Sequence, residues 1–375
     1  MNYTYSDFQA ISDSNSTISR WISVANFISL ISEAITKYEF AFACMGVIVN
    51  IFHLTILTRK SLRSNSINVI MIGIGICDLF NMSFEVYSNL RVMTYPDPDC
   101  WPPSTYTTQI IEVWLSAIKD DLRRLTPWLG VLMSSIRYLI IKMSMKPKFK
   151  MLSEPKFSII AMLIALVLST LWSAFYFARL TLIELDPWKP ANYCTGFPPG
   201  YTEPQYALAI DTEFLSDALL MVQVFLITDG TLKIIPTTLF PILAFLLIRE
   251  LNGAKSHRQK LAKKDEKADH TTSLVILMTV TFMTAEGPLG IIYVVQGFVT
   301  HITGLLNITS ELINIFAIFV AINATTHCLI CLTVSSQYRK TVKGMFLCQN
   351  CNRKKTSTIV VAAKVSVTST STVRQ

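Results

Sequence analysis

Long apolar stretches separated by short polar and basic segments recur along the 375-residue chain. An α-helix needs about 20 mainly apolar residues to cross roughly 30 Å of hydrocarbon. Five stretches meet this requirement clearly: 40–57, 69–87, 157–177, 274–295 and 312–334. The pattern therefore predicts transmembrane helices rather than the amphipathic elements of a water-soluble domain.

A further stretch, 110–141, carries a cluster of five charged residues at 119–124 inside apolar sequence. Asp120 precedes Arg123 and Arg124 by three and four residues, and Asp121 precedes Arg124 by three. Oppositely charged side chains at these spacings meet on adjacent helical turns. Because pairing lowers the cost of charge in a membrane, we expect this stretch to form one span.

The last stretch, 219–248, contains Asp229, Gly230 and Lys233. The part before Asp229 would reach only about 16 Å as a helix, which is too short to cross alone. We therefore expect the whole stretch to be one helix, which gives seven spans.

The segments that connect these spans differ strongly in their content of Lys and Arg. One set of alternate segments carries 24, whereas the other set carries five. Basic connecting segments stay in the cytoplasm, so we expect the N-terminus outside and the C-terminus inside. The basic set comprises 59–63, 137–156, 249–267 and the tail 339–374.

Composition agrees with a membrane protein, since 51% of the residues are hydrophobic and only 15% are charged. Soluble domains carry about a quarter charged residues, so a soluble enzyme is a poor interpretation. The net charge of +8 would elsewhere suggest nucleic acid, but here topology explains it. We expect an extracellular segment 1–39, a seven-helix domain 40–334, an amphipathic helix 335–348 and a cytoplasmic tail 349–375.

Cys100 and Cys194 are the only cysteines in the segments predicted to lie outside the cell. That compartment is oxidising, so we expect them to form a disulfide. The sequons at Asn2, Asn15 and Asn307 also fall in segments predicted to be outside, and they are candidate glycosylation sites.

Two Cys-x-x-Cys pairs near the C-terminus satisfy a zinc spacing on paper. Cys328 and Cys331 lie inside the seventh span, whereas Cys348 and Cys351 lie in the tail. Four thiolates converge there only if a helix unwinds in lipid, so we expect no metal site. Cys348 and Cys351 follow a basic amphipathic segment, where acylation would hold it against membrane lipid. Unmodified thiols are the equal alternative.

Polar residues near the middle of three spans resemble those of the rhodopsin-like G-protein-coupled receptors. Asn50, Asp78 and Asn323 lie in spans one, two and seven, and with Thr126 and Glu286 they predict a buried polar network. Helix-to-helix hydrogen bonding without a functional role is the alternative.

Three short motifs resemble those of the same family, with changes. Ser135-Ile136-Arg137-Tyr138 resembles Asp-Arg-Tyr with isoleucine at the acid. Phe282-x-x-x-Glu286-x-Pro288 resembles the Phe, Trp and Pro switch with glutamate at the tryptophan. Asn323-Ala324-Thr325-Thr326-His327 resembles Asn-Pro-x-x-Tyr.

The departures are similar to those of one subgroup, the nematode serpentine receptor class W. They comprise the segments DDLRRLTPW at 120–128, KIIP at 233–236, EGPLG at 286–290 and SSQYRK at 335–340. That group is itself similar to FMRFamide-type neuropeptide receptors. The resemblance runs from about residue 40 to 346. It implies a cell-surface receptor, for peptides or for an environmental cue, that activates a heterotrimeric G protein.

The resemblance also assigns expected roles at the inner half of the bundle. Arg137 would contact the G protein, and the acids Asp265, Glu266 or Asp269 would be its resting partners. Pro288 removes one backbone hydrogen bond and should kink the sixth span, which would give its inner half a lever arm. The residues expected to take part in activation are Asn50, Asp78, Arg137, Tyr138, Phe282, Pro288, Asn323 and His327.

On the ligand side, Lys119 is eighteen residues before Arg137, which is five full helical turns, so both project from one face. A lysine here argues against a simple amine ligand, because amine receptors of the family have a carboxylate. Glu112 would meet a cationic ligand or pair with Lys119. The residues expected to contact ligand are Glu112, Lys119, Asp120, Arg123, Trp188 and Glu286.

The outer segments contain ten acidic residues against five basic ones. An acidic mouth attracts cations, so a basic peptide ending in Arg-Phe-amide would suit it. A solvated acidic surface is the alternative. The acids are Asp7, Asp13, Glu33, Asp97, Asp99, Glu184, Asp186, Glu203, Asp211 and Glu213.

Other roles follow from the resemblance or compete with it. Asp78 and Thr126 match two positions of the family's sodium site. The Ser- and Thr-rich tail 356–372 would be phosphorylated and bound by arrestin, or act only as a spacer.

A transporter or channel is the main rival to a receptor, but no inverted repeat is evident. The histidines show no catalytic or metal spacing, so we expect no enzyme.

Overall fold

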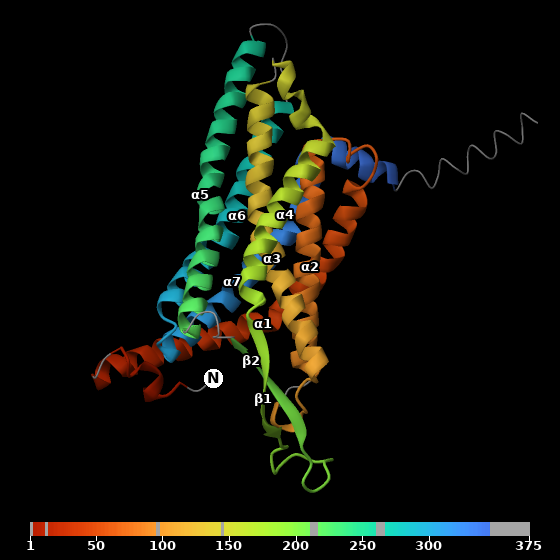
Figure 1. Ribbon diagram of the computed structural model, residues 1–375. Coiled ribbons are helices and arrows are strands. Elements are labelled where there is room, and N and C mark those ends of the chain that lie inside the picture. The colour runs from red at the N-terminus through yellow and green to blue at the C-terminus, as the bar shows by residue number, and fades with distance from the viewer. Residues whose placement is uncertain are drawn as a thin grey trace, which may run out of the picture.

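The computed structural model describes residues 3–11, 14–94, 98–143, 146–210, 217–259 and 267–345. Seven long α-helices lie side by side in one bundle (Figure 1). They are α1 (Asn15–Leu57), α2 (Ser66–Thr94), α3 (Tyr106–Lys142), α4 (Pro155–Phe177), α5 (Ala218–Gln259), α6 (Lys267–Phe298) and α7 (Thr303–Val334). Short 3-10 helices η1 (Tyr5–Phe8), η2 (Pro98–Cys100) and η3 (Pro147–Ser153) precede α1, α3 and α4.

Six of the seven helices are long and apolar enough to cross a membrane by length and composition. The exception is α3, because its charged residues lower the hydropathy of its central turns. Its first turn is capped by Thr105, whose hydroxyl accepts a hydrogen bond from the Thr108 amide. Because α3 packs against α2, α4 and α5, its charged side chains meet protein instead of lipid. The seven-helix architecture predicted from the sequence is confirmed.

Both charged stretches form single helices, as predicted. The stretch 219–248 lies within α5, which is continuous through Asp229, Pro236 and Pro241. The α6 helix is likewise continuous through Pro288. The expected bounds differ most at α1, which begins at Asn15 rather than near residue 40. Its first turns pack on the start of α7, where Phe8, Ile18 and Ile308 are buried together. Figure 1 shows this part of α1 lying across one end of the bundle.

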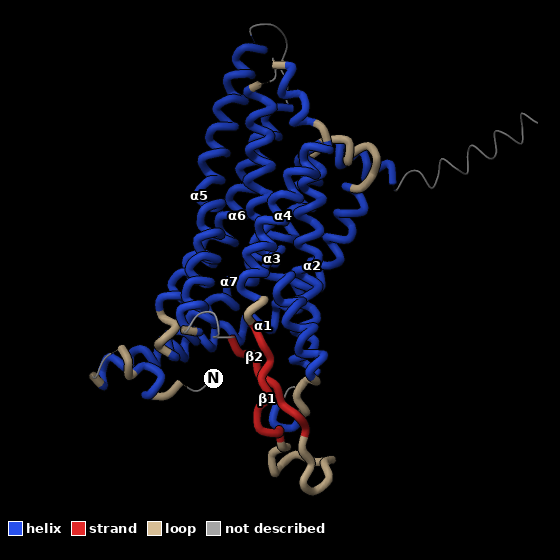
Figure 2. Tube along the Cα trace, viewed as in Figure 1, coloured by secondary structure: helices blue, strands red, loops and turns tan. Residues whose placement is uncertain are grey.

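Two antiparallel strands, β1 (Leu180–Trp188) and β2 (Glu203–Ile210), project from that same end (Figure 2). Leu180 pairs with Ile210 near the bundle, and Glu184 pairs with Tyr206. A disulfide between Cys100 and Cys194, with Cα atoms 5.3 Å apart, ties the hairpin connection to the segment before α3. We call this end of the molecule the hairpin end.

The opposite end, which we call the basic end, carries the last turns of α5 and the first turns of α6 (Figure 1). Residues 336–345 form a helix here, as the amphipathic pattern predicts. Its Tyr338 is buried against the largest apolar core cluster, together with Ile56, Ile136 and Leu247. Cys348 and Cys351 lie outside the described residues, as does Asn2. Asn15 is exposed at the start of α1, whereas Asn307 lies within the first turns of α7.

Candidate functional site

A buried ionic cluster joins α3, α4 and α5 in the half of the bundle nearer the hairpin end. Asp229 accepts a hydrogen bond from Arg124 Nε at 2.6 Å on one carboxylate oxygen, and Lys233 binds the other. Arg124 also donates to Ser173 Oγ at 3.0 Å. All four side chains are almost fully buried. A carboxylate between two cations offsets the cost of taking the charges out of water, so the cluster fixes these helices to one another.

The predicted pairing of Asp121 with Arg124 is present, but it is long. Asp121 Oδ1 lies 3.8 Å from Arg124, and Asp121 Oδ2 accepts a hydrogen bond from Thr170 at 2.7 Å. The predicted pairing of Asp120 with Arg123 or Arg124 is absent from the described residues, which show no ion pair to Asp120. The reason is that Arg124 turns toward Asp229, a partner on another helix that sequence spacing does not reveal.

Two further ion pairs connect α2 with the first half of α3. Lys119 Nζ lies 2.7 Å from Glu85 and 4.7 Å from the centre of the Phe84 ring. Glu112 binds Arg91 and accepts a hydrogen bond from Tyr87 at 3.0 Å. The expected pairing of Glu112 with Lys119 is therefore wrong. Seven residues separate them by about 10 Å along the helix axis, whereas α2 provides partners directly opposite.

Arg123 and Glu286 differ from these groups because they are buried without partners. The Arg123 side chain is 7% exposed, and its Nε and one terminal nitrogen have no hydrogen-bond partner among the described residues. Glu286 on α6 is 2% exposed, and its Oε2 has none either. The two side chains interact electrostatically but do not form an ion pair within 4.0 Å. We call them the α3–α6 pair.

Charged and aromatic groups surround the α3–α6 pair. The Lys233 ammonium lies 4.2 Å from the centre of the Tyr293 ring, and Tyr293 and Asp120 interact electrostatically with Arg123. A buried polar atom without a partner costs free energy, which is why such atoms are rare. The unpartnered atoms of Arg123 and Glu286 therefore mark a place where a ligand would gain hydrogen bonds.

The predicted network of five polar residues in mid-bundle forms only in part. Asp78 accepts a hydrogen bond from His327 Nδ1 at 3.0 Å, which joins α2 to α7. Asn50 donates to the carbonyls of Gly46 and Ala324 at 3.0 and 3.4 Å. The Thr126 hydroxyl instead donates a hydrogen bond to the carbonyl of Leu122 on the same helix. Glu286 Oε2 and Asn323 Oδ1 are buried and have no hydrogen-bond partner among the described residues. These two atoms therefore do not join the network.

Aromatic rings connect the part of α6 near Glu286 to this polar network. Phe282, one helical turn from Glu286, stacks on Phe240 of α5 with ring centres 4.9 Å apart. Its ring centre also lies 5.2 Å from that of His327. Gly130 makes room for the stack, because a Cβ atom there would lie 2.5 Å from Phe240. A set of contacts thus runs from Phe282, one helical turn from Glu286, through His327 to Asp78.

At the basic end, Arg137 is half-buried and forms no ion pair within the described part of the chain. Its expected partners Asp265 and Glu266 lie outside the described residues, as does the side chain of Asp269. Tyr138 accepts a hydrogen bond from Lys142 at 2.7 Å. The Tyr338 hydroxyl lies 2.9 Å from His53 Nδ1, so this hydrogen bond anchors the helix at 336–345 to α1.

Trp188 is separated from the other predicted ligand residues. It ends β1, roughly 26 Å from Leu180 at the spacing of an extended strand, and its ring packs edge-on against Phe197. Tyr201 nearby donates a hydrogen bond to Glu203, which raises the pKa of the Tyr201 hydroxyl above its usual value. These side chains form a surface of the hairpin, away from the buried charges.

The described residues contain no group of three or more His, Cys, Asp or Glu side chains that is placed to hold a metal ion. Asp78 and Thr126, the two residues that match a sodium site, are both buried. One oxygen of Asp78 is occupied by His327, so sodium binding there stays a prediction.

Comparison with known proteins connects this geometry to a family. The family model described as "Serpentine type 7TM GPCR chemoreceptor Srw" matches residues 37–349, which is most of the chain. The chain belongs to this family. The receptor is also similar to the G-protein coupled receptor dmsr-1 of Caenorhabditis elegans, at 22% identity over 371 residues, covering 87% of this chain and 70% of that protein. It is thus a multi-pass plasma membrane receptor, of a family of receptors rather than enzymes.

Several residues of the receptor's site were not predicted from its sequence. Glu85, Arg91 and Asp229 supply partners to α3, and Lys233 binds Asp229 from the same helix, although none of the four was a candidate site residue. Asp229 and Lys233 carried a usable signal, since opposite charges four residues apart in an apolar span pair on one helix face. Glu85 and Arg91 carried none, because their pairing depends on how α2 is rotated against α3.

Proposed function

We propose that this receptor binds a peptide with a basic, amidated carboxyl terminus and passes the signal to a heterotrimeric G protein. The observation that carries the proposal is the α3–α6 pair. Arg123 offers hydrogen-bond donors, Glu286 offers an acceptor, and both are buried without partners. A single small group that accepts from one and donates to the other would satisfy both.

A primary carboxamide has this combination of groups. Its carbonyl oxygen accepts from the guanidinium of Arg123, and its N–H₂ donates to the carboxylate of Glu286. A free carboxylate would satisfy Arg123 but would place a second negative charge beside Glu286. The pair therefore favours an amidated peptide end over the corresponding acid, and this difference is larger in a site shielded from water.

The charges around the pair favour a basic ligand. Apart from the pair of Arg91 with Glu112, six carboxylates face four cations in or near the bundle core within the described part of the hairpin half. This excess of two carboxylates is relieved by a cationic side chain on the ligand. The acids are Glu39, Glu85, Asp120, Asp121, Asp229 and Glu286, and the bases are Lys119, Arg123, Arg124 and Lys233.

The signal would pass from Glu286 toward the basic end along the side-chain contacts described above. A ligand that draws Glu286 toward itself shifts α6 near Pro288, where one backbone hydrogen bond is missing. Phe282 then moves against Phe240 and His327, and the Asp78 hydrogen bond changes with it. We infer that these shifts separate the helices around Arg137, which the charge asymmetry of the connecting segments predicts to face the cytoplasm.

The test uses two synthetic peptides that share a basic sequence ending in Arg-Phe and differ only in the terminal amide or acid. Cells expressing the full chain should respond to the amide at concentrations about tenfold lower, which corresponds to roughly 1.4 kcal/mol. In Glu286→Gln the side chain donates as well as accepts, so the preference for the amide should fall to about threefold or less.

The matched control for this substitution is Glu33→Gln. Glu33 pairs with Lys37 on an exposed face of α1, so the control makes the same chemical change away from the site. It should retain the full preference for the amide. Equal potency of the two peptides on the unmodified receptor, or an unchanged preference in Glu286→Gln at equal surface expression, would contradict the proposal.

A receptor for a small environmental molecule is the second candidate, and the family's description as chemoreceptors favours it. The two candidates differ in what the hairpin does. A peptide that reaches the α3–α6 pair must pass the hairpin and contact it, whereas a small molecule need not. Loss of the response after Trp188→Ala and Glu184→Gln would favour a peptide, and an unchanged response would favour a small molecule.

A further inference from the structure

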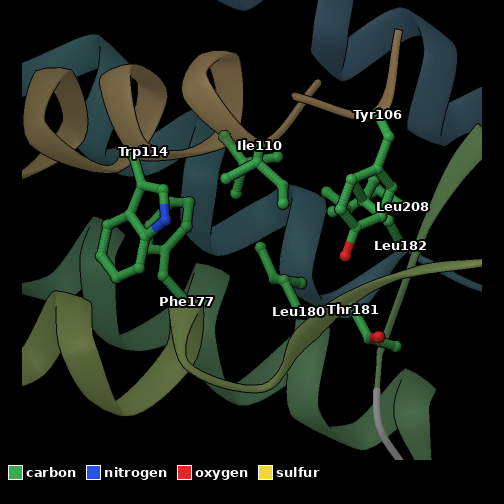
Figure 3. Close-up of a pocket in the computed structure, with 9 residues that line it drawn as sticks. Tyr106, Ile110, Trp114, Phe177, Leu180, Thr181, Leu182 and Leu208 are labelled. Carbon is green, nitrogen blue, oxygen red and sulfur yellow. The ribbon is translucent and has the colours of Figure 1, made fainter. Parts of the chain in front are cut away.

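A cavity of about 200 Å³ lies at the hairpin end, between the first turns of α3, the end of α4 and the hairpin (Figure 3). Ile110 and Leu180 form its middle, and Trp114 and Phe177 lie together at one end. It is separate from the α3–α6 pair and from Glu112, which points to α2. Nothing in the receptor function proposed above uses this cavity.

The lining of the cavity is uncharged. None of the nine described residues that line it carries a charge, so it offers no opposite charge to a phosphate, carboxylate or ammonium group. Its polar side chains are few, and two of them, Tyr106 and Thr181, lie toward the same end (Figure 3). The opposite end presents the rings of Trp114 and Phe177. The cavity therefore fits an uncharged molecule with an apolar body and a hydroxyl at one end.

Tyr106 is held in place on this end. Its ring lies edge-on to Tyr206 of β2, with ring centres 5.3 Å apart, and the cap at Thr105 fixes the turn from which it projects. Neither the Tyr106 nor the Thr181 hydroxyl has a hydrogen-bond partner among the described residues. Both hydroxyls can donate and accept, so together they can bind one alcohol group.

The cavity borders the outer surface of the bundle, since Trp114 lines it and is also 58% exposed. Trp114, Ile111 and Ile118 of α3 and Leu171 and Phe175 of α4 are all exposed, and such a surface on a membrane helix contacts the bilayer. Tryptophan and tyrosine at the end of a span mark the interface with the headgroups. A molecule can thus enter from the bilayer, with its hydroxyl at headgroup depth.

We propose that this cavity binds the hydroxyl-bearing end of a sterol from the surrounding membrane. An apolar cavity of about 150 Å³ accommodates benzene, so this one holds one to two fused rings. A rigid ring system loses less conformational entropy on binding than a flexible acyl chain does. The rest of the sterol would lie along the exposed side chains of α3 and α4.

The experiment uses the full receptor in phosphatidylcholine nanodiscs and a photoreactive cholesterol analogue with a free hydroxyl. The label should map to residues 106–114 and 177–182, and unlabelled cholesterol should compete. Leu180→Phe fills the middle of the cavity and should reduce labelling at least about fivefold. Leu329→Phe, the same change on an exposed face of α7, should leave labelling within about twofold.

A second variant tests the hydroxyl contacts and needs no change in cavity volume. Cholesterol should compete at concentrations about tenfold lower than 5α-cholestane, which lacks the hydroxyl. In the double variant Tyr106→Phe and Thr181→Val the two competitors should become equal. Equal labelling of Leu180→Phe and Leu329→Phe would overturn the proposal. So would equal competition on the unmodified receptor, or native mass spectrometry showing phospholipid retained in place of cholesterol.

Discussion

Asp229 holds two cations in place, which gives it a role that the exposed ion pairs of the receptor do not have. Asp229→Asn would leave Arg124 and Lys233 buried beside a neutral side chain. We expect a loss of about 3–5 kcal/mol of stability, the range found when one partner of a buried pair is removed. The measurement is thermal unfolding of the purified receptor.

Two further variants control this prediction. Glu33→Gln breaks an ion pair whose side chains are about 70% exposed, so it should cost no more than about 1 kcal/mol. Adding Lys233→Met to Asp229→Asn removes one of the two uncompensated charges and should restore part of the lost stability. If Asp229→Asn and Glu33→Gln lowered the melting temperature equally, the ionic cluster would not have the role described here.

At the scale of residues, the sequence predicted partners within a helix better than partners between helices. The pairing of Asp121 with Arg124 was visible from spacing, and the disulfide of Cys100 with Cys194 from compartment. Glu112 was expected to meet a cationic ligand or to pair with Lys119, because Glu112 and Lys119 lie on nearly the same face of α3. Its real partners, Arg91 and Tyr87, depend on the rotation and depth of α2, which no local pattern determines.

Among the helices, α5 and α6 approach closely where glycines replace side chains. A Cβ atom on Gly290 would lie 2.8 Å from Ile234 Cγ1 and 3.0 Å from the Gly230 carbonyl oxygen. Small residues allow such contact between membrane helices. We expect Gly290→Ala to push the helices apart at a cost of about 1–3 kcal/mol, measured as a lower melting temperature.

Gly253→Ala provides the matched control in α5. A Cβ atom there meets no atom within 4 Å, so only helix propensity changes, and alanine is favoured by up to about 1 kcal/mol. Its melting temperature should stay the same or rise. A rise in both variants would show that the close approach at Gly290 does not restrict α5 and α6.

The helices were the most predictable elements, because a membrane requires long apolar stretches whose backbone bonds are internal. The hairpin was not predicted. Its strands lie between two spans, are largely exposed, and pair across 14 intervening residues under the constraint of a distant disulfide. The first 25 residues of α1 were also missed, since they are too polar to read as a span and are ordered by contact with α7.

Across the whole molecule, the receptor places its buried charges near the hairpin and its basic segments at the opposite end. The set of contacts from Phe282 to Asp78 lies between them, and Arg137 lies beyond it. Charge counting along the sequence predicts that the basic end faces the cytoplasm. This arrangement separates the proposed ligand site from the proposed G-protein contact, so variants at the two ends should have different effects.

The most direct test of the account measures both events on one sample, the purified receptor in nanodiscs with a heterotrimeric G protein. Binding of the amidated peptide and peptide-stimulated nucleotide exchange are followed together. Arg137→Leu should bind the peptide as the unmodified receptor does but lose at least about 90% of the stimulated exchange, which is a tenfold effect. Full exchange with Arg137→Leu, or no exchange from the unmodified receptor with bound peptide, would contradict the account.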